Sequence, residues 1–232
     1  MKKIVLILAV VIICSVAYWM IRPSPYDSGT PLLSNGGSVQ LLDGLDTNVL
    51  PNGWLHQTFF RITPADYSMT EEGGTRILRC TTNNSASILV RDTQISVAKL
   101  PMLSWRWKVT HPIESDIDEA TEDGDDHPVR LYLQFSNEDG DMRGAEIIWS
   151  NKKYVPGDYK IIDSFYHYVA NGLNRNTQQW HDQIVDLRQL YSDIGGTGTA
   201  TLEALGFFCD SDNTGTRSDG SFSDVVLSAK SN

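Results

Sequence analysis

The sequence predicts an all-β fold in which two antiparallel sheets pack face to face as a sandwich. Short runs of alternating apolar and polar residues recur along the chain, and clusters of Asn, Asp, Gly and Ser separate them, as is typical of strands joined by turns. Helical periodicity is weak beyond the N-terminus. About eight to ten strands with long loops favour a two-sheet sandwich over a barrel.

The alternation is clearest in 103–109 and 129–135, where apolar side chains face one way and Ser, Arg, Lys, Tyr and Gln face the other. A turn at 137–141 leads from the second run into a returning strand at 145–149, as in a β-hairpin. One short helical turn is expected at 186–193. The remaining expected strands are 76–80, 86–91, 183–187, 205–209 and 222–227.

The first 22 residues predict one N-terminal helix that acts as a membrane anchor or a signal peptide. Residues 4–21 are uncharged and mostly apolar, which is enough to span a bilayer core of about 30 Å at about 1.5 Å per residue. Small residues at 15–17 also offer a cleavage site, so both alternatives stay open. Either one places the rest of the chain on the periplasmic side of an inner membrane, because Lys2 and Lys3 hold the N-terminus inside.

The chain is thus expected to have three parts. Residues 1–22 form the signal peptide or anchor, residues 23–38 form a flexible linker rich in Pro, Ser and Gly, and residues 39–230 form the β-sandwich domain. Two cysteines remain outside the apolar segment, Cys80 and Cys209, each in a strand-like run. They are either buried free thiols or a disulfide, which an oxidising compartment would permit.

Charge narrows the choice of ligands. The chain carries 29 acidic and 19 basic side chains, a formal net charge of −10 at pH 7. Such a surface repels phosphate backbones, so nucleic acid is not expected as a partner. A divalent cation or a neutral ligand such as a sugar is easier to accommodate.

Several segments together resemble a bacterial family known as domain of unknown function 3047. They include Gly53-Trp54, Ser85-Ala86-Ser87, the Trp-Arg-Trp run within 103–108, the segment Gly124 to Arg130 and the ending Asp210 to Gly215 with Ser223-Asp224-Val225. The resemblance covers roughly residues 40 to 228. It implies no established activity, and the strand pattern looks like the jelly-roll sandwich of carbohydrate-binding modules, which is an analogy of fold.

The polar face of the two clearest strands is the first candidate site. Arg106, Arg130, Tyr132 and Gln134 point the same way if the two strands are neighbours, and Glu146 could join them from the returning strand. Such a face suits hydrogen bonding to a polar ligand such as a sugar, whereas an ordinary solvated sheet face is the structural alternative.

A calcium site is the second candidate. Asp210 and Asp212 begin a loop with alternate oxygen side chains and a glycine turn, which can wrap a hard cation, and Asp224 could complete it. The loop departs from an EF-hand because Ser221 stands where a Glu is needed. A turn capped by Asp and Asn side chains is the alternative explanation.

The acidic loop 114–126 supplies the third candidate. Asp125 or Asp126 could form a structural ion pair with Arg130 or Arg106. If the chain is an enzyme, Asp125, Asp126 and His127 are the residues expected near the chemistry. The sequence holds no His-Glu-x-x-His, Gly-x-Ser-x-Gly or phosphate-loop motif.

Three functions stay open at this point. The leading hypothesis is an exported, non-catalytic module that binds a glycan or a similar polar ligand on a sheet face, with possible structural calcium as the one cofactor. The second is an enzyme that acts on envelope polysaccharide. The third is a structural or assembly partner in the envelope that uses an exposed strand edge.

Overall fold

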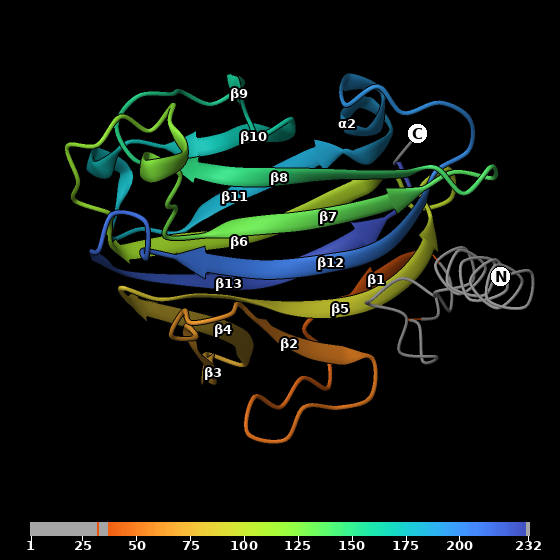
Figure 1. The fold of residues 1–232 in the computed structure, drawn as a ribbon. Helices are drawn as coiled ribbons and strands as arrows, with labels where there is room; N and C mark the ends of the chain where they lie inside the picture. The colour runs from red at the N-terminus through yellow and green to blue at the C-terminus, as the bar shows by residue number, and fades with distance from the viewer. Residues whose placement is uncertain (1–31, 33–36, 231–232) are drawn as a thin grey trace, which may run out of the picture.

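The strands arrange into two β-sheets that pack face to face (Figure 1). The computed structural model describes residue 32 and residues 37–230. The strands are β1 (Ser38–Gln40), β2 (Trp54–Thr58), β3 (Asp66–Glu72), β4 (Thr75–Asn83), β5 (Ala86–Ser96), β6 (Met102–His111), β7 (Arg130–Ser136), β8 (Met142–Ser150), β9 (Tyr159–Ile162), β10 (Phe165–Gly172), β11 (His181–Asp186), β12 (Thr201–Asp210) and β13 (Arg217–Ser228).

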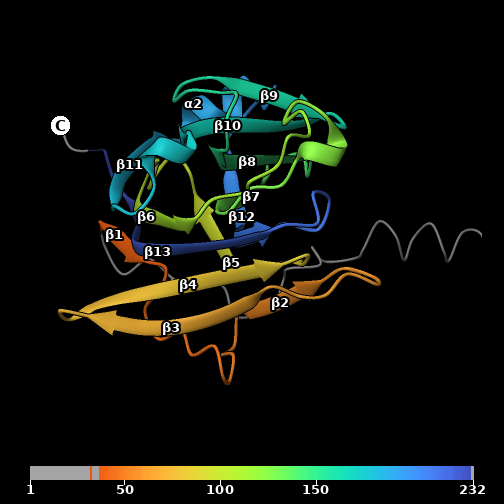
Figure 2. The same ribbon diagram turned by 90° about the vertical axis from the view of Figure 1, so that its left-hand side faces the viewer.

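One sheet has six strands and the other has seven. The six-stranded sheet runs β11-β6-β13-β4-β3, with β1 paired to β13, and the seven-stranded sheet runs β2-β5-β12-β7-β8-β10-β9. Figure 2 shows β9 and β10 at one margin of the molecule and β3 and β4 at the other. The pairing is antiparallel except between β8 and β10, which are parallel. The predicted two-sheet sandwich is therefore confirmed, with one parallel pair that the sequence did not predict.

The core lies between the sheets and follows from the period-two pattern. The apolar side chains of β6 and β7 that the sequence placed inward are all buried. Trp107 of β6 meets Trp149 of β8 edge to face across the two layers, with ring centroids 6.0 Å apart. Aromatic pairs of this kind add stability beyond the area that they bury.

A disulfide joins the two sheets through the core. Cys80 of β4 and Cys209 of β12 are both fully buried, and their Cα atoms are 6.5 Å apart, within the range that a disulfide spans. Of the two alternatives that the sequence left open, the structure contains the bridge.

Most predicted elements are present at the expected places. All the expected strands have counterparts, and the expected helical turn is α2 (Leu187–Asp193), which Asp186 caps by accepting a hydrogen bond from the Arg188 N–H at 3.0 Å. Two short 3₁₀ turns, Glu122–Gly124 and Asn174–Asn176, complete the elements. Within residues 37–230, no helix is both long and apolar enough to cross a bilayer. The apolar segment 1–22 and most of the linker 23–38 lie outside the described residues.

Candidate functional site

Arg130 is the centre of a buried cluster of charged side chains at one end of the seven-stranded sheet. As the first residue of β7, it points away from the core, because its neighbour Leu131 points inward. Loops and neighbouring side chains nevertheless cover it, so that only 2 % of the residue is exposed. A buried guanidinium requires partners, and the surrounding strands supply them.

All five N–H groups of the Arg130 side chain are matched by acceptors. Nη1 donates to Glu146 of β8 at 2.6 Å and to the Asp125 side chain at 3.5 Å. Nη2 donates to the Asp125 carbonyl at 2.5 Å and to Asp210, and Nε donates to Asp210 at 3.3 Å. Of the ion pairs that the sequence left open for Asp125 or Asp126, the structure contains the one between Asp125 and Arg130. Arg130 thus has no N–H left for a ligand.

His167 of β10 links two of these carboxylates. Its Nε2 lies 3.3 Å from both Asp125 and Glu146, and its Nδ1 lies 3.0 Å from the Phe165 carbonyl. Since both ring nitrogens face acceptors, the ring is held as an imidazolium. Burial lowers the pKa of His167, but the two carboxylates outweigh this effect and raise it above its usual value.

The carboxylates of the cluster are held ionised. Burial alone would raise the pKa of Asp125, but Arg130, His127 and His167 hold it far below its usual range. The pKa of Glu146 is also lowered, because the positive charges of Arg130 and His167 outweigh its burial. Both acids are therefore hydrogen-bond acceptors at neutral pH.

Lys160 and His127 also contact the Asp125 carboxylate. Lys160 of β9 donates to Asp125 at 2.5 Å and to the Glu119 carbonyl at 2.8 Å. His127 is fully buried and its Nδ1 lies 2.8 Å from the Trp149 carbonyl. Burial and the nearby Lys160 lower the pKa of His127, whereas the pKa of His167 is raised.

A cavity of about 250 Å³ opens on this cluster from the outer face of the seven-stranded sheet. Five carboxylate side chains border it, together with two phenylalanine rings, His167, Arg130 and Asn213. The acids are Glu122, Asp125, Glu146, Asp163 and Asp210, and the rings are Phe165 and Phe208. The volume lies below the range of about 300–1,000 Å³ for drug-sized ligands, so the opening suits a small ligand or one unit of a longer chain.

The β9–β10 hairpin forms one wall of the cavity. Its two turn residues, Asp163 and Ser164, both have positive φ, at 48° and 69°, as a tight hairpin turn requires. The turn brings Phe165 across β8, where Gly144 leaves room for its ring. Phe165 then stacks on Tyr132 of β7, with centroids 6.0 Å apart and planes within 6°.

The structure corrects the predicted ligand face in one respect. β6 and β7 are not neighbours, because β6 belongs to the six-stranded sheet and β7 to the seven-stranded sheet. Arg106 therefore does not join the other four residues; it forms ion pairs with Asp182 at 3.1 Å and Asp224 at 3.5 Å. Alternation shows which residues of one strand share a face, but not which strands pair.

The other four predicted residues do share the outer face of the seven-stranded sheet. Arg130 and Glu146 border the cavity, Tyr132 supports its Phe165 wall, and Gln134 follows on the same face of β7. The sequence prediction did not include His167, Lys160, Phe165 or Phe208. The alternation of 165–169 was the available signal for His167 and Phe165, but it does not disclose that this strand lies beside β8.

The residues predicted for an enzyme are only partly exposed to the cavity. Asp125 borders it, whereas Asp126 and His127 are fully buried. The Asp126 carboxylate instead accepts hydrogen bonds from the Thr214 N–H at 2.7 Å and the Asn213 N–H at 3.3 Å. It therefore fixes the loop 211–216 in place.

Two of the three residues predicted for a metal lie together. Oxygen atoms of Asp126, Asp210 and Asp212 lie within 4.8 Å of one another, close enough to share a divalent cation. Burial, followed by the negative charge of Asp126, raises the pKa of Asp212. Asp224 is not part of this set, because it lies on β13 of the other sheet and pairs with Arg106. Bound calcium stays a prediction.

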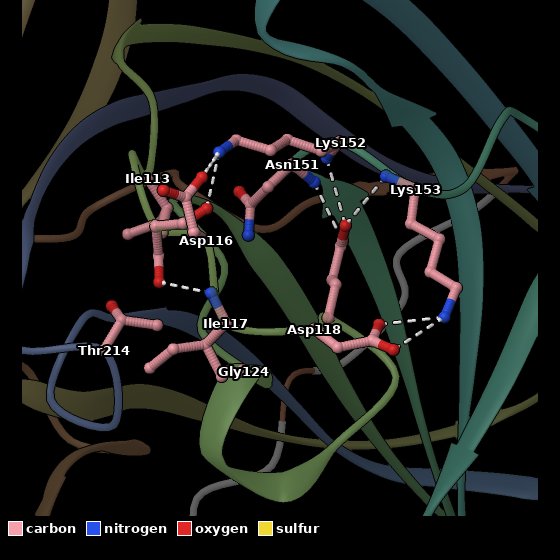
Figure 3. Close-up of a pocket in the computed structure, with 11 residues that line it drawn as sticks. Ile113, Asp116, Ile117, Asp118, Gly124, Asn151, Lys152, Lys153 and Thr214 are labelled. Carbon is pink, nitrogen blue, oxygen red and sulfur yellow. Dashed lines mark hydrogen bonds and ion pairs between the residues drawn. The ribbon is translucent and has the colours of Figure 1, made fainter.

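A second opening, of about 320 Å³, lies beside the acidic loop (Figure 3). Its charges are matched within the protein: Lys152 pairs with Asp116 at 3.1 Å and Lys153 with Asp118 at 2.8 Å. The buried Glu119 carboxylate accepts the backbone N–H groups of residues 151–153 at 2.8–3.1 Å. These contacts fix the part of the loop that its charge alone would keep extended.

The fold and the cavity define a β-sandwich protein with a charged site on an outer sheet face. The chain belongs to the family described as protein of unknown function DUF3047, whose profile matches residues 52–226. No match to the chain was found among the curated proteins.

Three solved structures illustrate what the fold is similar to. One is the enzymatically active domain of tailspike protein 4 of bacteriophage CBA120, at 9% identity and TM-score 0.42, over 86% of this chain and 21% of the tailspike chain. Another is the xyloglucanase domain of a Sinorhizobium fredii effector in complex with cellobiose, at 8% identity and TM-score 0.42, over 76% and 93% of the two chains.

The third is a family 29 carbohydrate-binding module, at 13% identity and TM-score 0.32, over 79% of this chain and 86% of the module. This chain spans about a fifth of the tailspike protein. All three scores lie below 0.5, and the function proposed below rests on the geometry of the site.

Proposed function

We propose that the chain is a binding module that takes a neutral, hydroxyl-rich ligand, a glycan, in the cavity above Arg130. The observation that carries the proposal is the surplus of acceptors in this cavity. Five carboxylates border it, and its guanidinium is already saturated by protein acceptors. A ligand that fits must donate hydrogen bonds and must not carry negative charge.

The aromatic walls support the same ligand class. Phe165 and Phe208 border the cavity, and Phe208 also lies under the guanidinium of Arg130, with its ring centroid 4.3 Å away. A sugar ring presents C–H groups on its faces and hydroxyl groups around its rim. The two phenyl rings match the C–H faces of a sugar, and the surrounding carboxylates match its hydroxyl groups.

The electrostatics favour binding over glycoside hydrolysis. Hydrolysis by a carboxylate pair needs one acid whose pKa is raised, so that it can donate a proton to the leaving group. Here the pKa values of Asp125 and Glu146 are both lowered by Arg130 and His167. Neither of these two carboxyl groups therefore holds a proton at neutral pH that it could donate to a leaving group.

Affinity electrophoresis of the full chain tests the proposal. We expect retardation in gels that contain a neutral polysaccharide (dextran, hydroxyethyl cellulose or galactomannan), and no retardation in alginate, which is anionic. Phe165→Ala should weaken the retardation, whereas Met142→Ala, at an exposed position of β8, should leave it unchanged. Equal retardation of the wild type and Phe165→Ala, or retardation in alginate alone, would rule out this site.

We further propose that the module works on the periplasmic side of the inner membrane, anchored by the apolar segment 1–22 or released from it. The disulfide between Cys80 and Cys209 supports this location, since such bonds persist in oxidising compartments. A glycan of the cell envelope would be the ligand that is present there.

A further inference from the structure

We propose that the opposite face of the sandwich carries a second glycan site, centred on Trp180. A groove of about 390 Å³ lies there, on the outer surface of the six-stranded sheet. It is separate from the cavity above Arg130, which belongs to the other sheet. Residues of its border include Glu71, Glu72, Arg79, Lys108, Trp180 and Ser221.

The floor of the groove follows from the register of three strands. Ser221 of β13 pairs with Lys108 of β6 on one side and with Arg79 of β4 on the other. Neighbouring strands are about 4.8 Å apart, so the two long cations stand about 10 Å apart with a small serine between them. A short side chain on β13 between long side chains on β4 and β6 makes a trough that runs along β13.

Trp180 closes one side of the trough as a partly exposed aromatic platform. Its ring lies against the two cations of β6, with the centroid 5.0 Å from Lys108 Nζ and 5.3 Å from Arg106 Cζ. Such cation–π contacts hold the ring against the sheet. An indole held in this way resembles the rigid aromatic surfaces on which ligands stack.

The loop before Trp180 is fixed to the end of β6. The Gln178 N–H donates to the Val109 carbonyl at 2.8 Å, and the Gln178 side chain donates to the Thr110 carbonyl. His181, which follows Trp180, lies within 2.8 Å of the Asn176 carbonyl through its Nε2. The platform is therefore preorganised, which lowers the entropy cost of binding.

The charges of the groove select a neutral ligand. Arg79 is paired with Asp219, and Arg106 with Asp182 and Asp224. Among the described residues, Lys108 has no acid within ion-pair distance, but Glu71 and Glu72 border the same groove. The trough thus offers donors and acceptors without surplus positive charge, and an uncharged glycan chain matches it better than a uronic acid polymer.

A glycan site on each outer face would let one domain bind two polysaccharide chains at once. Linkage of two sites increases the overall affinity for a polymeric ligand well beyond that of either site. This inference concerns a different surface from the proposed function, and each can hold without the other.

The experiment compares the full-length wild type with Trp180→Ala, Phe165→Ala and the double variant. The gels contain dextran, hydroxyethyl cellulose or galactomannan, or alginate as the anionic control. We expect Trp180→Ala to weaken binding by about tenfold or more, as is usual when a central aromatic contact is lost. Trp180→Phe should restore part of the binding, and Ile184→Ala, an exposed change on β11 outside the groove, should have no effect. Thermal unfolding of each variant verifies that it is folded.

The outcomes separate the two sites. Weaker retardation of each single variant and no retardation of the double variant would support sites on both faces. Weaker retardation of Trp180→Ala, with wild-type retardation of Phe165→Ala, would support binding in the Trp180 groove and contradict binding in the cavity above Arg130. Wild-type binding by folded Trp180→Ala, no retardation of the wild type in any neutral gel, or retardation only in alginate would overturn the inference.

Discussion

Arg130 is the counter-ion that three carboxylates share in the buried cluster. Removal of its charge would leave Asp125, Glu146 and Asp210 buried as anions without their shared counter-ion. We expect Arg130→Leu to lower the free energy of unfolding by about 3–5 kcal/mol, the usual cost of breaking a buried pair. Urea unfolding measures this value.

Arg106→Leu is the matched control. Arg106 also contacts two carboxylates, but 38% of its side chain is exposed, so its loss should cost less than about 1 kcal/mol. Equal losses in the two variants would contradict the buried network described for Arg130.

His167 makes the stability depend on pH. Its pKa is raised by Asp125 and Glu146 against the opposing effect of burial, so the folded chain holds the proton more tightly than the unfolded chain. The stabilisation is fully present below the unfolded pKa of about 6.5 and is lost as pH rises through the folded pKa. His167→Gln lacks this contribution.

We therefore expect the difference in free energy of unfolding between wild type and His167→Gln to be largest near pH 6 and to shrink towards pH 9. Thermal unfolding across this range measures it, and about 1 kcal/mol corresponds to roughly 2–4 °C in a domain of this size. A difference that stays constant from pH 6 to 9 would show that His167 is not charged in the fold.

The residues of the cluster that lie near one another along the chain could be predicted from the sequence. Asp125 and Arg130 are five residues apart, and Glu146 follows in the next strand of a hairpin. His167 and Lys160 were not predicted, because they reach the cluster on β9 and β10 after a long connection from β8. Neither distance along the chain nor the alternation of side chains in a strand indicates where such a crossover places the next strand in the sheet.

At the scale of elements, the parallel pairing of β8 and β10 shapes the cavity. β10 lies beside β8 in a register that pairs His167 with Glu146, and Phe165 leans over Gly144. A Cβ at Gly144 would stand 2.5 Å from an atom of the Phe165 ring, so Gly is needed there for space.

We expect Gly144→Ala to displace Phe165 from Tyr132. The change should weaken glycan binding in the affinity gels and lower the free energy of unfolding by about 1–3 kcal/mol, as overpacking does. Met142→Ala, on the same strand, should change neither value. Full binding by Gly144→Ala would mean that Phe165 does not form a working wall.

The strands themselves were well predicted because each has one buried face. β6 and β7 alternate strictly, and their inward residues form the core. The condition that these two strands are neighbours was not met, and the sequence could not decide it, since each pattern is equally compatible with either sheet. β1, β2, β3, β9 and β10 were not predicted, and of these β2 and β3 are largely exposed.

At the scale of the whole molecule, the disulfide between Cys80 and Cys209 ties one sheet to the other. The two residues are 129 positions apart, so the bridge closes a long loop and restricts the unfolded chain strongly. The bridge could not be decided from the sequence, because two apolar strand-like runs around cysteines fit free core thiols equally well.

We expect reduction of this disulfide to lower the free energy of unfolding by about 2–4 kcal/mol, the usual contribution of a native bridge. Urea unfolding with and without a thiol reductant measures the effect, and the double variant Cys80→Ala with Cys209→Ala should be insensitive to the reductant. The same comparison bears on location, because a chain isolated from the bacterial periplasm should carry the bond whereas one made in the cytosol should not. Reduced cysteines in periplasmic protein, or unfolding unaffected by reductant, would contradict a structural bridge between the sheets.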